Sequence, residues 1–259
     1  MEVIPLTWAF RIERKPNGEF DKFKARLAVR GDLKHDERET CAPVVKQVTV
    51  RTLLALALQM KSKARQTDFD DAFVQAELNE KERMCITLPV GVHHATHESK
   101  DAALKLLKSL CGMKEAHKLW FQNVTAGLMG MGFERSQRDQ CPFMHKKKQR
   151  TLLLCTNDCL LFCETDKMFQ EMTVTMHETF SLTEQDVRKD MLDYSGTQST
   201  FKGTKVMARQ DGLMKNIFKT TKWEELTGDK TPAREKPIGA DSEGNQFKKN
   251  ECMQVLCEC

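Results

Sequence analysis

The sequence has no apolar stretch close to the ~20 residues that a membrane-spanning helix needs. Residues 1–5 also lack the basic and apolar regions of a secretory signal peptide. No segment of the chain repeats elsewhere in it. These absences argue against a helical membrane protein. We expect an intracellular protein, cytoplasmic or nuclear, that is not secreted.

The ten cysteines lack the close paired spacing of a disulfide framework. A structural zinc site would need two such pairs, and therefore four ligands. Two groups stand out without meeting that requirement: Cys155, Cys159 and Cys163 recur at a regular spacing, and Cys252, Cys257 and Cys259 lie at the end. We expect most cysteines to fill the core, with no structural zinc.

The charge balance does not specify a partner. The chain of 259 residues has a net charge of +4, which permits a polyanionic partner without requiring one. The basic residues are nevertheless distributed unevenly along the chain, in two clusters. Each cluster could bind phosphate groups or form ordinary solvated surface. They comprise Arg11, Arg14, Lys15, Lys22, Lys24, Arg26 and Arg30 near the start, and Lys146, Lys147, Lys148 and Arg150 later on.

Residues 8–12 and 22–30 alternate between apolar and polar side chains around a Pro16-Asn17-Gly18 turn, which predicts a β-hairpin. A basic face of this kind suits phosphate groups, because Arg offers a bidentate fork and Lys a point charge. Plain exposed strand surface has the same pattern, so both interpretations stay open. Period two places Lys22, Lys24, Arg26 and Arg30 on one face and Phe23, Ala25, Leu27 and Val29 on the other.

Two aspartates end predicted strands on separate segments. Residues 152–162 read as two short apolar runs around a polar tip, which predicts a hairpin with Asp158 at its tip. Asp68 ends an earlier strand, just before a turn and short helix at residues 70–73. Carboxylates suit a hard ion such as Mg²⁺. A nucleotidyl-transfer site normally takes two adjacent acids from such a hairpin, whereas Cys159 follows Asp158 here.

Apolar spacing and breaker residues outline the other elements. A strand at residues 84–88 should end before Pro89, and residues 90–102 should form a loop with solvent-exposed His93, His94 and His97. Beyond residue 194 the chain turns polar, so a packed ending is doubtful. A largely buried helix is predicted over residues 49–60, with Thr49 as its N-cap. A second helix is predicted over residues 115–129, with Trp120, Val124 and Leu128 as its buried stripe. A third, amphipathic helix is predicted over residues 166–180.

Six segments occur together in an order and spacing that is specific. They are Trp8-Ala9-Phe10-Arg11-Ile12, Lys24-Ala25-Arg26-Leu27, Cys41-Ala42-Pro43-Val44-Val45-Lys46, Thr67-Asp68 through Phe73, Ser109-Leu110-Cys111-Gly112-Met113-Lys114 with Trp120, and Gly132-Phe133 with Arg135-Ser136. Together they resemble the reverse transcriptase of Ty1/copia-type retrotransposons. The resemblance covers roughly residues 7–165, with a fainter continuation to about Pro232.

The resemblance implies an α+β right-hand polymerase fold, with an antiparallel palm sheet flanked by helices, partial fingers and an eroded thumb. Residues 1–196 would form fingers and palm, and residues 197–259 a degenerate thumb or connection-like tail, partly disordered. The implied activity is RNA-directed DNA polymerase, which takes a template-primer and a deoxynucleoside triphosphate. Two Mg²⁺ or Mn²⁺ ions would serve the transfer to the primer 3′-hydroxyl, with Asp68 and Asp158 as catalytic metal ligands.

The resemblance also assigns a nucleotide-binding set. Lys24 and Arg26 would face the triphosphate, and Phe73 would stand where the family has the aromatic that screens out a ribose 2′-hydroxyl. Asp71, Ala72 and Gly112 complete the implied set.

Three departures from the family pattern predict impairment. The family's Y-V-D-D becomes Thr156-Asn157-Asp158-Cys159, where a neutral thiol is a poor Mg²⁺ ligand. In the family's Y-G-L-K-Q-A-P the glutamine becomes Glu115, beside an anionic substrate, and the apolar pattern of residues 186–196 is broken. We expect a severely impaired or inactive polymerase. A non-catalytic remnant with weak nucleic-acid binding, or an unfolded product, are the alternatives.

Overall fold

The computed structural model describes residues 3–14, 19–34, 40–87, 89, 103–145, 150–184, 191–194, 197–202, 205–211, 214 and 217. The chain divides into two compact units, residues 1–188 and 189–259. This division lies before the boundary expected at residue 196. The predicted histidine loop, most of the second basic cluster, the C-terminal cysteines and most of the predicted tail lie outside the described residues.

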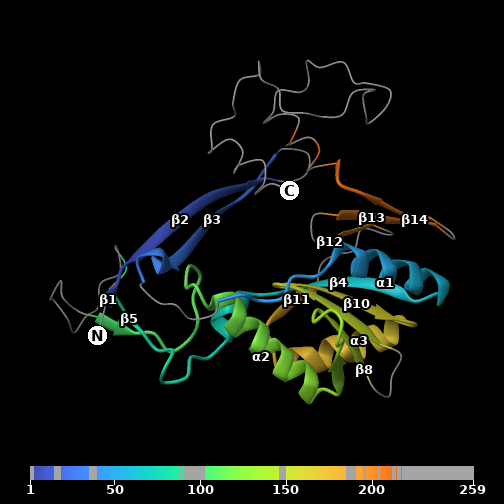
Figure 1. Cartoon of the computed structure of the whole chain (residues 1–259). Coiled ribbons are helices and arrows are strands. Elements are labelled where there is room, and N and C mark those ends of the chain that lie inside the picture. Colours follow the sequence, from blue (N-terminus) through green and yellow to red (C-terminus); the bar gives the residue numbers. More distant parts are fainter. Residues whose placement is uncertain are drawn as a thin grey trace, which may run out of the picture. The chain divides into compact units, whose positions relative to one another are not determined.

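An antiparallel six-stranded sheet with strand order β11-β4-β10-β9-β8-β7 forms the centre of the first unit (Figure 1). Strands β9 and β10 confirm the predicted hairpin, although its turn is only Thr156 and Asn157, so that Asp158 begins β10. The strands are β4 (Lys63–Phe69), β7 (Phe133–Arg135), β8 (Pro142–His145), β9 (Thr151–Cys155), β10 (Asp158–Cys163) and β11 (Leu182–Glu184).

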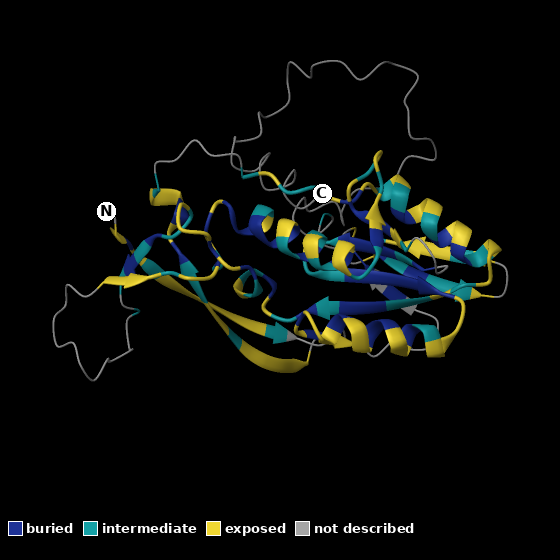
Figure 2. Cartoon of the chain, turned by 90° about the horizontal axis from the view of Figure 1, so that it is seen from below, coloured by how far each residue is buried: buried dark blue, intermediate teal, exposed yellow. Residues whose placement is uncertain are grey.

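Helices α2 (Ala116–Gly130) and α3 (Asp166–His177) pack against one face of this sheet and share its main apolar cluster. The predicted stripe of Trp120, Val124 and Leu128 is confirmed as buried in that cluster. Figure 2 shows buried residues concentrated in the sheet and on the inner sides of the helices, with exposed residues on the outer sides. The main apolar core therefore lies between the β9-β10 hairpin and helices α2 and α3.

Helix α1 (Gln47–Gln59) contacts β4 and buries only Val50, Leu54 and Ala57, so it is a surface helix and not the largely buried one expected. Its start also differs from the prediction, because the helix begins before Thr49. The Thr49 hydroxyl instead donates to Asp139 Oδ2 at 2.6 Å, and the Lys46 N–H donates to the same atom at 3.3 Å. A distant acid thus caps α1.

Strands β2 (Leu6–Arg14) and β3 (Phe20–Val29) confirm the predicted hairpin near the start of the chain. One face pairs Arg11 with Lys24, and the other carries large apolar side chains. That apolar face is not covered as expected for a half-buried strand: Phe10 is 77% exposed and Phe23 is 78% exposed. Both faces of the outer hairpin are therefore accessible.

A small three-stranded sheet joins the base of this hairpin to the rest of the unit. It consists of β1 (Val3–Ile4), β5 (Cys85–Thr87) and β6 (Ala103–Lys105), in the order β1-β5-β6. Its apolar cluster combines Ile4 and Val29 with Met113, Ala116 and Leu119. Two short 3₁₀ helices, η1 (Gly31–Leu33) and η2 (Ala72–Gln75), lie beside these elements in the sequence.

The second unit contains an antiparallel sheet of β12 (Met191–Tyr194), β13 (Thr197–Lys202) and β14 (Lys205–Arg209). Leu192 and Tyr194 of β12 and Ser199 of β13 are buried side chains. A packed ending beyond residue 194 was doubtful from the sequence; the structure forms β13 and β14 there, and Thr197 and Ser199 of β13 are buried. No described helix of either unit is long and apolar enough to cross a bilayer.

Candidate active site

The two predicted acids meet at the end of the central sheet. Asp68, near the end of β4, lies directly opposite Asp158, the first residue of β10, in their antiparallel pairing. Side chains of directly opposed residues project from the same face of a sheet. The structure therefore brings together two carboxylates that are far apart in the sequence.

A third polar side chain, Asn157, contacts Asp68 directly and was not among the predicted site residues. Its amide Nδ2 donates to Asp68 Oδ1 at 2.6 Å, and its backbone carbonyl accepts from the Phe69 N–H at 2.9 Å. An ionised carboxylate only accepts hydrogen bonds, which matches the amide nitrogen, and not the amide oxygen, facing Asp68. The hairpin thus presents a donor to the first acid.

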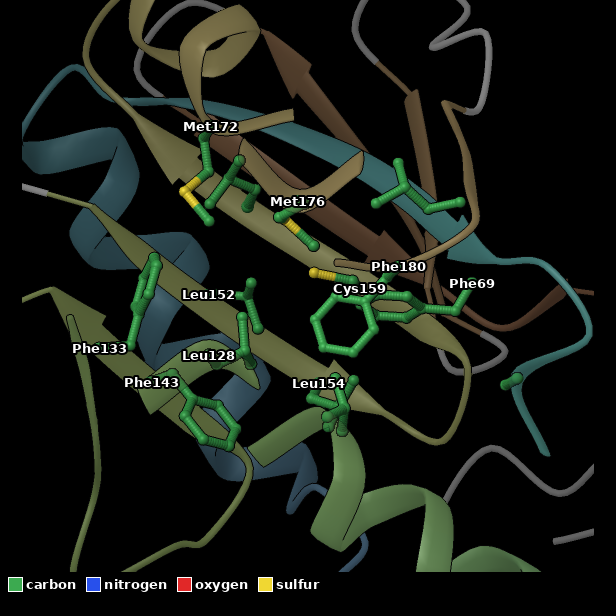
Figure 3. Packing of buried hydrophobic residues seen from close by; sticks show 14 of the residues in the cluster. Phe69, Leu128, Phe133, Phe143, Leu152, Leu154, Cys159, Met172, Met176 and Phe180 are labelled. Atoms are coloured by element: carbon green, nitrogen blue, oxygen red, sulfur yellow. The ribbon is translucent and has the colours of Figure 1, made fainter. Parts of the chain in front are cut away.

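Cys159, assigned by sequence to the lost ligand position, does not reach the site. It pairs with Thr67 on the opposite face of the strand and is 0% exposed. Figure 3 shows its side chain among those of Phe69, Met176 and Phe180. The structure corrects the assignment, because successive strand residues point to opposite faces. Burial also raises the pKa of the Cys159 thiol to about 12, which keeps it neutral.

The electrostatic environment of Asp68 combines opposing effects. Burial raises the pKa of this carboxyl above its usual value, and the neighbouring charge of Asp70 acts in the same direction. The hydrogen bond from Asn157 and the positive charge of Lys24 lower that pKa in part. Lys24 of the β2-β3 hairpin is therefore close enough to act on the acid. Asp70 itself accepts from the Thr183 hydroxyl at 2.7 Å.

The basic face of the β2-β3 hairpin is present, with an acid among its cations. Lys24 Nζ donates to Glu13 Oε1 at 2.8 Å, and Lys22 Nζ lies 3.6 Å from Glu13 Oε2. The bond from Lys24 lowers the pKa of Glu13. Arg26 lies exposed on the same face, whereas Arg30 follows the strand and binds Asp32 instead.

Trp120 supports the turn that carries Asn157. Its indole Nε1 donates to the Thr156 carbonyl at 2.7 Å, and its ring is buried in the core. Thr156 has a φ of +56°, a left-handed conformation that is uncommon for a β-branched residue. The indole bond satisfies this carbonyl and therefore stabilises the strained turn.

Gly112 lies where two backbones approach each other too closely for a side chain. It has a φ of +84°, and a Cβ there would lie 2.1 Å from the Val29 carbonyl oxygen. A Cβ on Gly31 would lie 2.2 Å from the Gly112 oxygen, and the Val29 N–H donates to Cys111 O at 2.7 Å. The predicted substrate turn is thus anchored to the base of the β2-β3 hairpin.

Glu115, the acid that replaces the family's glutamine, is neutralised within the protein. Lys34 Nζ lies 2.7 Å from Glu115 Oε1, and both side chains are mostly buried. Lys114 Nζ donates to the Lys34 carbonyl at 2.7 Å. The ion pair offsets the negative charge that sequence analysis placed beside an anionic substrate.

The remaining predicted nucleotide residues follow β4. Asp71 is exposed with a φ of +44°, and Ala72 is buried in η2. The Phe73 ring packs edge-on against His117 at a centroid distance of 4.7 Å. Nothing in the structure tests their roles toward a nucleotide, and those roles stay predictions.

The residues present do not fit a two-metal site. Within the described ranges, no group of three or more His, Cys, Asp or Glu side chains is arranged to hold a metal ion. Two-metal transfer relies on oxygen ligands that bridge the cations. Here the Asn157 amide N–H occupies Asp68 Oδ1, and it would have to turn away before a cation could bind that oxygen.

Comparison with known proteins identifies a family model and several relatives that this chain resembles. The family model described as "Reverse transcriptase (RNA-dependent DNA polymerase)" matches residues 1–234. The Pol polyproteins of transposon RE2 from Arabidopsis thaliana and TNT 1-94 from Nicotiana tabacum are each 26% identical over 68% of this chain. The Ty1-H Gag-Pol polyprotein of Saccharomyces cerevisiae is 28% identical over 66% of it.

The chain spans only 13% of the first two polyproteins and 9% of the third. Among solved structures, telomerase from Candida albicans in complex with a fragment of telomeric RNA matches with a TM-score of 0.41 and 7% identity, covering 86% of this chain and 50% of that one. Apo telomerase from Candida tropicalis matches with a TM-score of 0.36 and 7% identity, covering 79% and 55%.

Proposed function

Because the chain belongs to the reverse transcriptase (RNA-dependent DNA polymerase) family, as a domain of the Ty1/copia type, we propose that it binds template-primer and a deoxynucleoside triphosphate but transfers nucleotides very poorly or not at all. The observation that carries this proposal is the contact of the Asn157 amide with Asp68, opposite Asp158. The two acids of the site are kept, while the side chain in contact with Asp68 is a neutral amide with its N–H toward the carboxylate.

In this proposal the six-stranded sheet with α2 and α3 is the palm, and the β2-β3 hairpin belongs to the fingers. The β12-β13-β14 sheet of the second unit would be the remnant of the thumb. Support for the first assignment comes from the site itself, because both acids stand at the end of adjacent central strands.

The nucleic-acid part of the proposal rests on the basic hairpin face. The positive charge of Lys24 lowers the pKa of Asp68 in part, so this lysine of the face lies near the first acid. Phosphate oxygens would compete with Glu13 for Lys24, and the exposed Arg26 offers a bidentate fork. Binding of this type is driven by counterion release and weakens steeply with salt.

The metal part of the proposal is limited by the donor set. Divalent ions in such sites activate the attacking hydroxyl and stabilise the leaving oxygen. Asp68 and Asp158 would be the residues to hold them, in a position that Asn157 makes unfavourable. Template-primer binding should therefore survive where transfer does not.

Primer extension tests the proposal. A homopolymer template with an annealed primer is incubated with Mg²⁺ or Mn²⁺, using the wild-type chain and its Asp68→Ala variant. We expect incorporation near background for both, together with salt-sensitive binding of the same template-primer by a protein that melts cooperatively. Efficient extension that Asp68→Ala abolishes would show a working polymerase, and absence of both binding and a cooperative melt would exclude the proposal.

A further inference from the structure

We propose that Asn157 occupies the position of a metal-ligating carboxylate, and that its amide nitrogen closes Asp68 to a divalent cation. A single Asn157→Asp substitution would then assemble a cation site from residues 68, 157 and 158. This inference deepens the proposed function and rests on it. It assigns the lost ligand to Asn157, whereas the sequence pattern had pointed to Cys159.

The distances support an exchange of amide for carboxylate. Asn157 Nδ2 lies 2.6 Å from Asp68 Oδ1, and asparagine and aspartate have nearly the same shape. Two oxygens bound to one Mg²⁺ at ~2.1 Å along adjacent octahedral directions lie ~3.0 Å apart. The amide nitrogen therefore stands close to where the second ligand oxygen would be. Without a cation, two carboxylates at this spacing repel each other.

The backbone of residue 157 is held by contacts that do not involve its side chain. Its carbonyl accepts from the Phe69 N–H, and the preceding Thr156 carbonyl accepts from the Trp120 indole. An aspartate at this position would therefore be presented to Asp68 in the same way. Asp158, directly opposite Asp68, adds a further carboxylate on that face.

The same geometry changes how the hairpin compares with the family's Y-V-D-D. Shifted by one residue, the motif matches Cys155-Thr156-Asn157-Asp158, with the two acids at 157 and 158. In this register Cys159 follows the motif and enters the core, where it is 0% exposed. The register with Cys159 as the second acid would require a buried carboxylate on the wrong face of β10.

Direct Mn²⁺ binding tests the inference without any polymerase assay. Free Mn²⁺ is measured by electron paramagnetic resonance in titrations of the wild type, Asn157→Asp, Asn157→Ala and Cys159→Asp. We expect Asn157→Asp to bind Mn²⁺ at least ~10-fold more tightly than the wild type. Asn157→Ala should show a smaller gain, because it removes the donor without adding an oxygen. Cys159→Asp should show no gain.

Thermal melts provide the second readout. Asn157→Asp should melt lower than the wild type without metal and gain stability on addition of Mn²⁺, because a cation that binds only the folded state stabilises it. The inference is overturned if Asn157→Asp binds Mn²⁺ no better than Asn157→Ala, or if Cys159→Asp is the variant that gains. Should Asn157→Asp fail to fold, an Asn157→Ala affinity equal to that of the wild type overturns it equally.

Template-primer binding of the wild type separates the two proposals. A gain of Mn²⁺ binding in Asn157→Asp supports the inference even where the wild type binds no template-primer, which would exclude the proposed function alone. A wild type that binds template-primer, combined with an Asn157→Asp variant that gains no Mn²⁺ affinity, supports the function and excludes the inference.

Discussion

Three consecutive residues of one hairpin have three different environments. Asn157 donates to Asp68 from the turn, Asp158 faces Asp68 across the strand pair, and Cys159 is sealed in the core. The change from turn to strand between residues 157 and 158 decides which side chains can act together. At the scale of single residues, therefore, a shift of one position separates a site residue from a core residue.

Backbone geometry at Gly112 gives a sharp prediction at the same scale. Gly112→Ala should lower the free energy of unfolding by ~2 kcal/mol or more, because the Cβ would meet the Val29 oxygen in a backbone with positive φ. Urea unfolding followed by circular dichroism measures the change. Gly130→Ala is the matched control, since nothing lies within 4 Å of a Cβ there and α2 has a helical backbone at that residue. Equal effects of both substitutions would contradict the close approach.

At the scale of elements, contacts from distant segments fix where helices and turns begin. Helix α1 has no side-chain cap of its own and takes Asp139 as an acceptor at its start. The turn before α2 is anchored by the approach of Gly112 to the β2-β3 hairpin and by the Lys34–Glu115 pair. These links connect elements that hold the candidate site.

Asp139→Ala should lower the free energy of unfolding by ~1 kcal/mol at neutral pH, the usual cost of a lost N-terminal cap. Burial alone would raise the pKa of Asp139, but bonds from the Thr49 hydroxyl and the Cys141 and Lys46 amides outweigh it and lower that pKa. Because the folded pKa is lower than the unfolded value, this stability is present above the unfolded pKa and is lost as pH falls through the folded pKa.

Urea melts across the acid range check this prediction. The difference between wild type and Asp139→Ala should be constant near neutral pH and shrink below the ordinary aspartate pKa of 3.8. Asp139→Asn, which keeps an acceptor without the charge, should fall between the two. A gap that widens on acidification would show that Asp139 does not act as an ionised cap.

At the scale of the whole molecule, the described part of the chain combines a well-packed centre with an accessible arm. The central cluster buries residues from the six-stranded sheet, α2 and α3, whereas the β2-β3 hairpin exposes a basic face and an apolar face. The small net charge of +4 means that electrostatic binding depends on where the cations gather. We therefore expect the hairpin to dominate the salt dependence.

The double substitution Lys24→Gln with Arg26→Gln should weaken template-primer binding and reduce the slope of log K against log [salt] by ~1–2, about one per lost phosphate contact. Fluorescence anisotropy at several salt concentrations measures the slope. Lys81→Gln is the control, because Lys81 is an exposed lysine in a turn that is not part of the β2-β3 hairpin. An equal change of slope in the control would show non-specific attraction to the whole surface.

Local sequence patterns were sufficient to predict many of the helices and strands. Alternation predicted β2 and β3, helical spacing predicted the buried stripe of α2, and bounded apolar runs predicted β9 and β10, because each pattern reflects the geometry of its own element. They failed for β13, where the small polar side chains of Thr197 and Ser199 are buried. A polar strand sequence does not reveal which of its side chains other parts of the chain will bury.

For this protein the sequence by itself determined the family, through motifs in a specific order, and pointed to two acids, Asp68 and Asp158, as candidate site residues. Only the tertiary structure decided that Asn157 contacts Asp68 and that Cys159 is buried. The physical reason is that a motif lists neighbours along the chain, whereas a site depends on strand register and on the face from which each side chain projects. Both are set by pairing β10 with β4 and by the core behind them.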